Sequence, residues 1–281
     1  MKIGFIGAGR VGCTLGKMFR EHGISVSGYY SRTKEHAEEA AQFTDTSVYE
    51  SLESLSHESD ALFLTVSDNS IISVFQELDK TVDLTGKIIC HTSGAMSSEV
   101  FSSEQQIYCY SIHPMYAVSD RFETYKNFQK AFITIEGAKE KLQDMQTVFD
   151  VCGMKYTVIT ARDKAVYHAA SVFSSNYVCA LFATSVDLLT RCGFEKDDAR
   201  VALSGLFLGN AIGTAEKGPE LQLTGPIERC DTATVEKHLA SLPETYRDLY
   251  LSLARRTLDV AKEKNITRGY SDMENLLKEE K

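Results

Sequence analysis

The chain opens with the stretch Met1-Lys-Ile-Gly-Phe-Ile-Gly-Ala-Gly-Arg-Val-Gly12, which decides the fold. Its apolar half predicts a short buried strand, and the spacing Gly-x-Gly-x-x-Gly then leads into a helix. In this setting the first glycine permits a tight turn, the second lets the backbone approach a pyrophosphate, and the third lets the helix pack closely on the sheet. Free N–H groups at the start of the helix attract the anion. We therefore predict that a dinucleotide is held by Gly7, Ala8, Gly9, Arg10, Val11 and Gly12.

The residues after the glycines indicate which dinucleotide is bound. Helical spacing of apolar residues continues to Gly23, a typical C-cap, and a second strand is predicted over residues 24–30. NAD-selective proteins carry an acidic residue at the end of this strand, but here Ser31, Arg32 and Thr33 follow it. A guanidinium holds a phosphate with two hydrogen bonds, so the segment predicts NADP(H) as the cofactor. The alternative is that Arg32 is an ordinary exposed loop arginine.

Composition narrows the class of protein. A chain of 281 residues can hold two domains, and the net charge of -9 argues against nonspecific binding to nucleic acid or an acidic membrane. The seven cysteines contain no C-x-x-C pair, which indicates free thiols in a reducing cytoplasm and neither a disulfide framework nor a metal site. No apolar run is expected to reach the roughly 20 residues of a membrane helix, and the N-terminus lacks a cleavable signal pattern. We expect a cytoplasmic protein with no membrane and no nucleic acid among its partners.

The pattern of elements changes near residue 160. Before it, predicted strands alternate with helices, and continuous apolar runs of the parallel-strand type end near residues 66, 91 and 113. After it, only helical patterns occur. We predict an α/β protein. Its N-terminal part (residues 1–160) is predicted to be a Rossmann domain with a doubly wound parallel sheet, to which an extra pair of strands can be added. An all-α domain for substrate binding (residues 161–281) follows it, with the ligand at their junction.

Reactive side chains stand at three predicted strand ends, where open α/β sheets bind ligands. Val66 and Ser67 are expected on the nicotinamide side of the cofactor, and Thr92 and Ser93 follow the next strand. His113 ends another strand, and histidine titrates in the range useful for proton transfer. We predict that His113 exchanges a proton with the substrate and that Ser93 orients this proton. The alternatives are a core histidine bonded to a backbone carbonyl and a plain turn serine.

A long helix is predicted over residues 163–192. At about 100° per residue, Lys164, His168, Ser171 and Ser175 form one polar stripe, with Asn176 near its edge. Small hydroxyls, a histidine and an asparagine suit a lined cleft better than a solvated face. This favours a catalytic role for His168 and substrate binding by Asn176. The alternative is a helix that is buried all round, with its hydroxyls bonded back to the preceding turn.

A Gly-Pro turn later in the chain brings two opposite charges close together. Arg229 and Asp231 stand just before a predicted helix that begins at Thr232. Arg229 is a candidate ligand for an anionic substrate. Alternatively, Asp231 caps the helix and Arg229 pairs with it.

Taken together, these segments resemble a family of Rossmann-like NADP oxidoreductases whose C-terminal domain is a helical domain of unknown function. The resemblance covers almost the whole chain. Besides the glycine triplet it rests on His91-Thr-Ser-Gly94, Ser111-Ile-His-Pro114, Tyr167-His-Ala-Ala-Ser-Val-Phe-Ser-Ser-Asn176 and Leu223-Thr-Gly-Pro-Ile-Glu-Arg-Cys-Asp231. One departure is Cys230, where the family pattern usually has glycine.

More distantly, the chain is similar to prephenate dehydrogenases, ketopantoate reductases and pyrroline-5-carboxylate reductases. In the prephenate enzymes a serine and the histidine of a His-Pro motif lie at the reacting centre, and Ser93 and His113 match those positions. Residues 168–176 match the paired-histidine helix motif only loosely, and the ketopantoate-type Lys/Asn pair is not cleanly present, so neither substrate is implied. Such relatives are commonly dimers whose helical domains complete each other's clefts, which implies a homodimer here.

The sequence thus predicts an NADPH-dependent oxidoreductase that reduces a C=O or C=N group of a small, anionic metabolite. The alternative is a catalytically silent NADP(H)-binding sensor or scaffold, in which side chains fill the cleft between His113 and His168. The sequence leaves the substrate and the direction of hydride transfer open.

Overall fold

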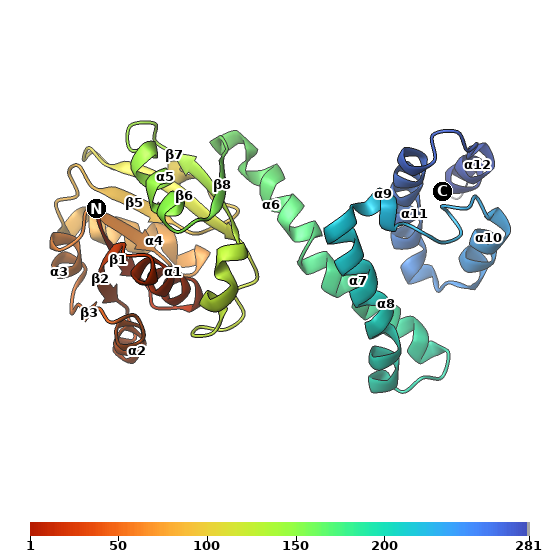
Figure 1. The fold of residues 1–281 in the computed structure, drawn as a ribbon, viewed down its shortest axis with the longest axis horizontal. Helices are drawn as coiled ribbons and strands as arrows, with labels where there is room; N and C mark the ends of the chain where they lie inside the picture. Colours follow the sequence, from red (N-terminus) through yellow and green to blue (C-terminus); the bar gives the residue numbers. More distant parts are fainter. Residues whose placement is uncertain (280–281) are drawn as a thin grey trace. The chain divides into compact units, whose positions relative to one another are not determined.

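The computed structural model describes residues 1–279 and divides the chain into two compact units, Met1–Ser174 and Ser175–Lys281. The first unit contains a sheet with helices, and the second contains helices (Figure 1). The sequence predicted a domain boundary at residue 160, whereas this division places the helix Lys164–Phe173 (α6) with the first unit.

The first unit is built on one eight-stranded sheet in the order β3-β2-β1-β4-β5-β6-β7-β8. Neighbouring strands are parallel except for β6 and β7, which pair antiparallel, while β7 and β8 are again parallel to each other. The predicted α/β class, the doubly wound parallel sheet and the extra strand pair are therefore confirmed. The strands are β1 (Lys2–Ile6), β2 (Ser25–Tyr30), β3 (Ser47–Val48), β4 (Ala61–Leu64), β5 (Ile88–His91), β6 (Tyr108–Met115), β7 (Phe132–Gly137) and β8 (Lys155–Val158).

Helices connect these strands and cover both faces of the sheet. They are α1 (Arg10–Glu21), α2 (Lys34–Thr44), α3 (Leu52–His57), α4 (Asp68–Thr81), α5 (Leu142–Val151) and α6 (Lys164–Phe173), with 3-10 turns at Ser98–Val100, Thr124–Lys130 and Ala161–Asp163. Neither β3 nor α3 is indicated by a sequence pattern, because a two-residue strand and a six-residue helix are too short for a periodic pattern.

Two apolar clusters pack on opposite faces of the sheet. In β4, Phe63 belongs to one cluster, and Leu62 and Leu64 belong to the other, because successive side chains of a strand point to opposite faces. Phe19 of α1 joins the first cluster and Phe75 of α4 the second. Burial on both faces explains why β4 is a continuous apolar run in the sequence.

The second unit is helical and has a core of its own. Its helices are α7 (Asn176–Arg191), α8 (Lys196–Lys217), α9 (Pro219–Gln222), α10 (Thr232–Ser241), α11 (Glu244–Lys264) and α12 (Ser271–Glu279). The core lies between α10, α11 and α12, where Val235, Ala261 and Met273 are fully buried. The predicted all-α character of this part is confirmed.

The single helix predicted over residues 163–192 is wrong. α6 ends at Phe173 and α7 begins at Asn176, with a turn at Ser174 and Ser175 between them. The break falls at two adjacent serines, a residue type that disfavours helix interiors. The Ser175 hydroxyl donates to the side-chain oxygen of Asn176 at 3.0 Å.

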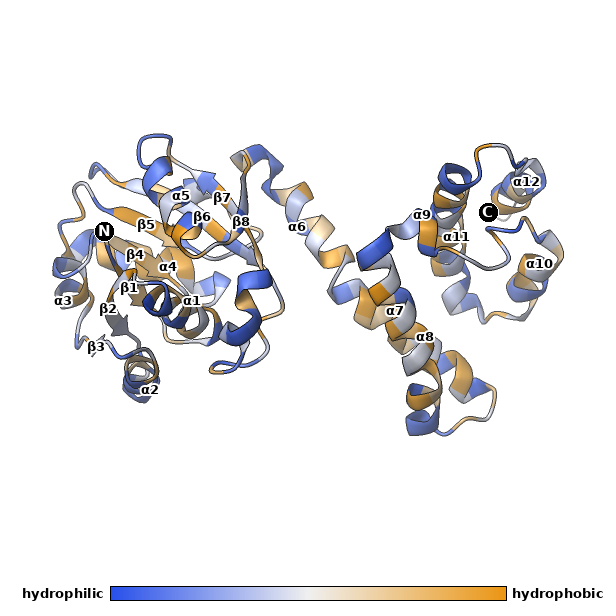
Figure 2. Ribbon diagram, viewed as in Figure 1, coloured by the Kyte–Doolittle hydropathy of each residue, from blue (hydrophilic) through white to orange (hydrophobic). Residues whose placement is uncertain are grey.

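Residues Ala161–Arg191 are long and apolar enough to cross a membrane by length and composition alone. This corrects the expectation that no apolar run reaches that length, although core helices of soluble proteins meet the same test. Val166 and Phe173 of α6 are 76% and 67% exposed. Figure 2 shows further hydrophobic residues along α7 and α8, several of which are exposed.

Candidate active site

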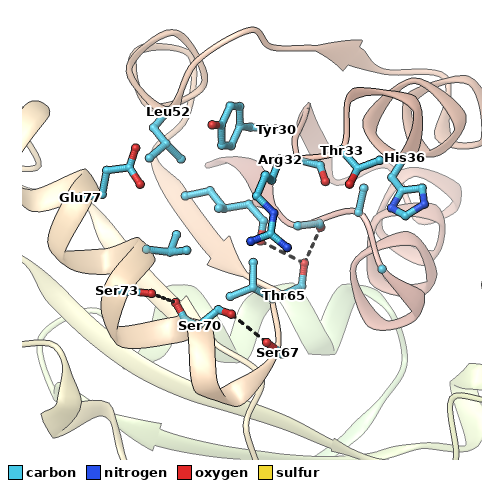
Figure 3. Close-up of a pocket in the computed structure, with 17 residues that line it drawn as sticks. Tyr30, Arg32, Thr33, His36, Leu52, Thr65, Ser67, Ser70, Ser73 and Glu77 are labelled. Atoms are coloured by element: carbon cyan, nitrogen blue, oxygen red, sulfur yellow. Dashed lines mark hydrogen bonds between the residues drawn. The ribbon is translucent and has the colours of Figure 1, made fainter.

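A pocket of about 700 Å³ lies at the carboxyl ends of β1, β2 and β4 (Figure 3). Eight of the predicted cofactor residues line it, namely Gly7, Ala8, Gly9, Ser31, Arg32, Thr33, Val66 and Ser67. Four others, Arg10, Val11, Gly12 and Thr92, are not part of its lining. His36, in the first turn of α2, also lines the pocket and was not predicted. The only indication in the sequence was its position about one helical turn after Thr33.

The three glycines of the opening turn have the three properties that their spacing predicts. Gly7 has a φ of 104°, which favours glycine. A Cβ added to Gly12 would lie 2.5 Å from Thr65 Oγ1, so this position holds α1 close to the end of β4. The nearest atom to a Cβ at Gly9 is 3.9 Å away, which leaves the backbone open to a ligand. Within residues 1–279 no side chain caps the N-terminus of α1, and its first turn contains no acidic residue, so its first N–H groups are available to an anion.

Arg32 points into this pocket with an exposed side chain (Figure 3). Within the part of the chain that the structure describes, its guanidinium has no ion pair or hydrogen bond. Thr33 and His36 line the pocket on the same side, and Glu77 lies at the other end of the labelled group. The guanidinium is therefore available to a phosphate group of a ligand.

A second group of polar residues gathers at the carboxyl ends of β5 and β6. Ser93, just beyond β5, is buried, and its hydroxyl donates to Asp68 Oδ2 at 2.6 Å. The same hydroxyl accepts hydrogen bonds from the backbone N–H groups of Ala95 and Met96 at 3.3 and 3.2 Å. This serine is thus tied to the first residue of α4 and not to His113.

His113 of β6 is held by Tyr167 of α6, whose hydroxyl lies 2.6 Å from His113 Nδ1. Burial lowers the pKa of His113 to about 4, and the positive charge of Lys164 and the neighbouring His168 act in the same direction. The imidazole is therefore neutral at neutral pH. The alternative of a core histidine bonded to a backbone carbonyl does not describe this contact.

His168 lies beside His113, with ring centroids 6.4 Å apart. Its Nδ1 atom is buried and has no hydrogen-bond partner within residues 1–279. A Cβ added to Gly94 would lie 2.7 Å from this nitrogen and 2.9 Å from His113 Nε2. The absence of a side chain at Gly94 is therefore what lets two imidazole nitrogens converge. Ser93, His113 and His168 thus lie close together at the ends of β5 and β6, while their catalytic roles stay predictions.

Lys164 is a site residue that the sequence analysis did not single out. Only 2% of it is exposed, and its ammonium donates to the Ser93 carbonyl at 3.1 Å and to Ser111 Oγ at 2.8 Å. Burial lowers the pKa of Lys164 to about 8, while the charges of Glu136 and Asp68 oppose this shift. Its place on the polar stripe with His168 was the available signal, but the spacing could not reveal its burial.

Two more buried polar residues support these strand ends. His91 accepts from the Ser93 N–H through Nδ1 at 3.2 Å, and its Nε2 lies 3.1 Å from the Ser97 carbonyl. Burial lowers the pKa of His91 to about 4, so it is neutral. The Glu136 carboxylate accepts two hydrogen bonds from Ser98. No group of three or more His, Cys, Asp or Glu residues suited to a metal ion is found among residues 1–279.

The predicted substrate ligands Asn176 and Arg229 belong to the second unit, and their roles stay predictions. Both side chains are exposed. Asp231 caps α10, since its carboxylate accepts from the N–H of Thr234 at 3.1 Å, while no ion pair joins it to Arg229 within residues 1–279. Cys230 has a φ of 60°, in the left-handed region that favours glycine, which fits the glycine that the family resemblance leads us to expect there.

The fold and the glycine turn place this chain among proteins with the fold of dinucleotide-dependent oxidoreductases. More specifically, the chain combines two recognised domains. Residues 1–114 match the Rossmann-like domain, and residues 131–257 match a domain of unknown function, DUF2520. The predicted resemblance is therefore confirmed at the level of the domains.

Solved structures agree with this fold. The Thermotoga maritima protein TM1727 shares 24% sequence identity over 94% of this chain and 99% of its own, with a TM-score of 0.74. A Bacteroides fragilis protein assigned as an NADP oxidoreductase shares 21% over 92% and 98%, with a TM-score of 0.69. Pyrroline carboxylate reductase of Plasmodium falciparum, solved with NADP bound, shares 17% over 94% and 96%, with a TM-score of 0.58. No curated protein matches the sequence.

Proposed function

We propose that this protein is an NADPH-dependent oxidoreductase that reduces a C=O or C=N group of a small, anionic metabolite. One observation carries the proposal. A pocket suited to a dinucleotide and a cluster of two imidazoles and a buried ammonium lie at the carboxyl ends of strands in the same sheet. Ligands of open α/β sheets bind along this edge.

The residues of the pocket fit NADP(H). The open backbone at Gly9 and the uncapped N-terminus of α1 would hold the pyrophosphate. Arg32 would hold the 2′-phosphate, because its guanidinium points into the pocket without another partner among residues 1–279. When bound, the nicotinamide supplies the hydride. Relatives whose names refer to NADP support this choice of cofactor.

The cluster at the ends of β5 and β6 would then act on the acceptor. A neutral His113 would donate a hydrogen bond to the oxygen or nitrogen of the reducible group, as a neutral imidazole does when it polarises a carbonyl. The Lys164 ammonium lies next to this imidazole and adds positive charge, which favours an anionic substrate and the negative charge that develops during reduction. His168 Nδ1, which lacks a partner within the described chain, is a further group for the substrate.

The cofactor assignment is tested with Arg32→Ala and with Lys34→Ala as the matched control. Lys34 is a neighbouring exposed cation that pairs with Glu50 at 2.8 Å and does not line the pocket. We expect Arg32→Ala to weaken NADPH binding by about tenfold or more, the loss of one charge-assisted phosphate contact, with NADH binding unchanged. Equal affinities of Arg32→Ala and wild type for NADPH would remove the assignment.

The reaction is tested by following NADPH oxidation with 2-keto acids, imines and aldehydes. We expect turnover with one of these classes, and a large loss of kcat in His113→Ala with little change in NADPH affinity. Binding of NADPH without turnover of any class would favour a catalytically silent sensor or scaffold. Full turnover by His113→Ala would refute the role of this histidine.

We further propose that the protein is a homodimer that associates through its helical unit. Val201, Leu208 and Ile212 of α8 support this, because they recur at helical spacing on one side of the helix and are 74%, 56% and 55% exposed. An exposed apolar stripe of this kind is costly on a monomer. Light scattering on the wild type and on Leu208→Glu tests the proposal. A wild-type mass of one chain would contradict it.

A further inference from the structure

The orientation of the His113 imidazole is set by α6 and not by its own strand. Its Nδ1 lies 2.6 Å from the hydroxyl of Tyr167, and the two rings are nearly perpendicular, at 86°. The other ring nitrogen, Nε2, lies beside Gly94, where a Cβ would be 2.9 Å away. Tyr167 therefore holds one nitrogen while the other faces the cluster with His168.

The direction of the hydrogen bond between Tyr167 and His113 follows from the chemistry of its two ends. A phenol O–H is a stronger donor than the N–H of a neutral imidazole, and an imidazole nitrogen is a stronger acceptor than a phenol oxygen. Burial lowers the pKa of His113 to about 4, so the ring is neutral and has one acceptor nitrogen. Thr134 of β7 pairs directly with His113 in the antiparallel register of β6 and β7, and its buried hydroxyl has no hydrogen-bond partner within residues 1–279.

The phenol proton of Tyr167 is therefore donated to His113 Nδ1, at 2.6 Å. A neutral imidazole that accepts at Nδ1 carries its own proton on Nε2. The ring thus presents an N–H beside Gly94.

We propose that Tyr167 is a positioning residue that fixes His113 as the Nε2–H tautomer and aims this N–H at the substrate position beside Gly94. The proposal deepens the function proposed above and rests on it for its catalytic consequence. It makes Tyr167 the counterpart of the groups that orient a catalytic histidine elsewhere. The tautomer itself is a property of the folded chain, so it can be measured without any substrate.

The tautomer is tested by nitrogen NMR of the full-length protein labelled at histidine, with the His113 signals identified by their loss in His113→Gln. In the wild type we expect Nδ1 to be unprotonated and Nε2 to carry the proton. In Tyr167→Phe we expect the two nitrogen shifts to move toward each other, because both tautomers become populated. Tyr116→Phe is the matched control, since Tyr116 is also half-buried in the first unit but packs on Phe128.

Kinetics provide the second measurement. We expect kcat of Tyr167→Phe to fall about 10- to 100-fold, the usual effect of removing a residue that orients a reacting group, while KM for NADPH stays unchanged. If Tyr167→Phe folds poorly, the nitrogen shifts of the wild type alone still decide whether Nε2 of His113 carries the proton.

A wild-type His113 protonated on Nδ1 would overturn the proposal. So would Tyr167→Phe with unchanged nitrogen shifts and unchanged kcat. If the wild type shows the expected tautomer but turns over no substrate, the proposed function fails while the positioning of His113 by Tyr167 stands.

Discussion

Two glycines of the same opening turn are expected to fail in different ways when each is replaced by alanine. Gly12 packs against the core, because its added Cβ would lie 2.5 Å from Thr65 Oγ1 and 2.6 Å from the carbonyl oxygen of Gly7. Gly9 has open space, because the nearest atom to its added Cβ is 3.9 Å away. Gly12→Ala should therefore cost stability, whereas Gly9→Ala should cost cofactor binding.

The magnitude for Gly12→Ala follows from the clash. Neither neighbour can move freely, since Thr65 Oγ1 donates to the Gly7 carbonyl at 2.7 Å. Overpacking of this kind costs about 3 kcal/mol, and the better helix propensity of alanine returns about 1 kcal/mol. The net loss is about 2 kcal/mol, or about 4–8 °C in Tm for a unit of this size.

Gly9→Ala should leave stability within about 1 kcal/mol of the wild type. Its φ of -80° and ψ of -167° suit alanine, and only the helix N-cap preference is lost. The new methyl group would stand where the pyrophosphate approaches, so we expect the Kd for NADPH to rise at least about tenfold.

Thermal unfolding without ligand and NADPH titration, both on the two full-length variants, provide the assay. Wild-type stability in Gly12→Ala would refute the packing argument. Wild-type NADPH affinity in Gly9→Ala would refute the pyrophosphate site.

Three further predictions concern single residues. Burial lowers the pKa of Lys164 to about 8 from an ordinary 10.5. Between pH 8 and 10.5 the unfolded chain therefore binds more protons than the folded chain, and the free energy of unfolding should rise with pH. Denaturant unfolding should show this rise in the wild type and its loss in Lys164→Met. The ring-proton NMR signal of His113 should titrate near pH 4, where burial places its pKa, and a midpoint near 6.5 would contradict its burial. Cys230→Gly should stabilise the protein by about 1 kcal/mol, because glycine removes the backbone strain of the left-handed conformation at φ 60°. Cys230→Ala keeps this strain and should not stabilise the protein. Equal unfolding midpoints of the two variants would contradict this explanation.

Local signals in the sequence were sufficient for the fold and for the cofactor turn. The conformation of Gly7 and the open position of Gly9 are properties of a few consecutive residues, and the continuous apolar run of β4 follows from burial on both faces. The position of Arg32 in the pocket follows from its place directly after β2, because a residue at a strand end can project only into the space beyond the sheet edge.

Contacts between distant segments could not be derived in this way. The hydrogen bond from Lys164 to Ser111 joins residues 53 apart in sequence, and that between His113 and Tyr167 joins residues 54 apart. From the sequence, we expect Ser93 to orient the proton that His113 exchanges, whereas the Ser93 hydroxyl donates to Asp68. A helical stripe shows which side chains share a face, but it does not show which partners that face meets.

By itself, the sequence determined the doubly wound sheet, the dinucleotide turn and the helical C-terminal part, because backbone conformation and the periodicity of burial are written in neighbouring residues. Only the tertiary structure decided the state of the reactive groups. The pKa of His113, the burial of Lys164 and the approach of His168 to Gly94 depend on how α6 packs on the ends of β5 and β6. Desolvation and charge act through space, so they are fixed only when these segments meet.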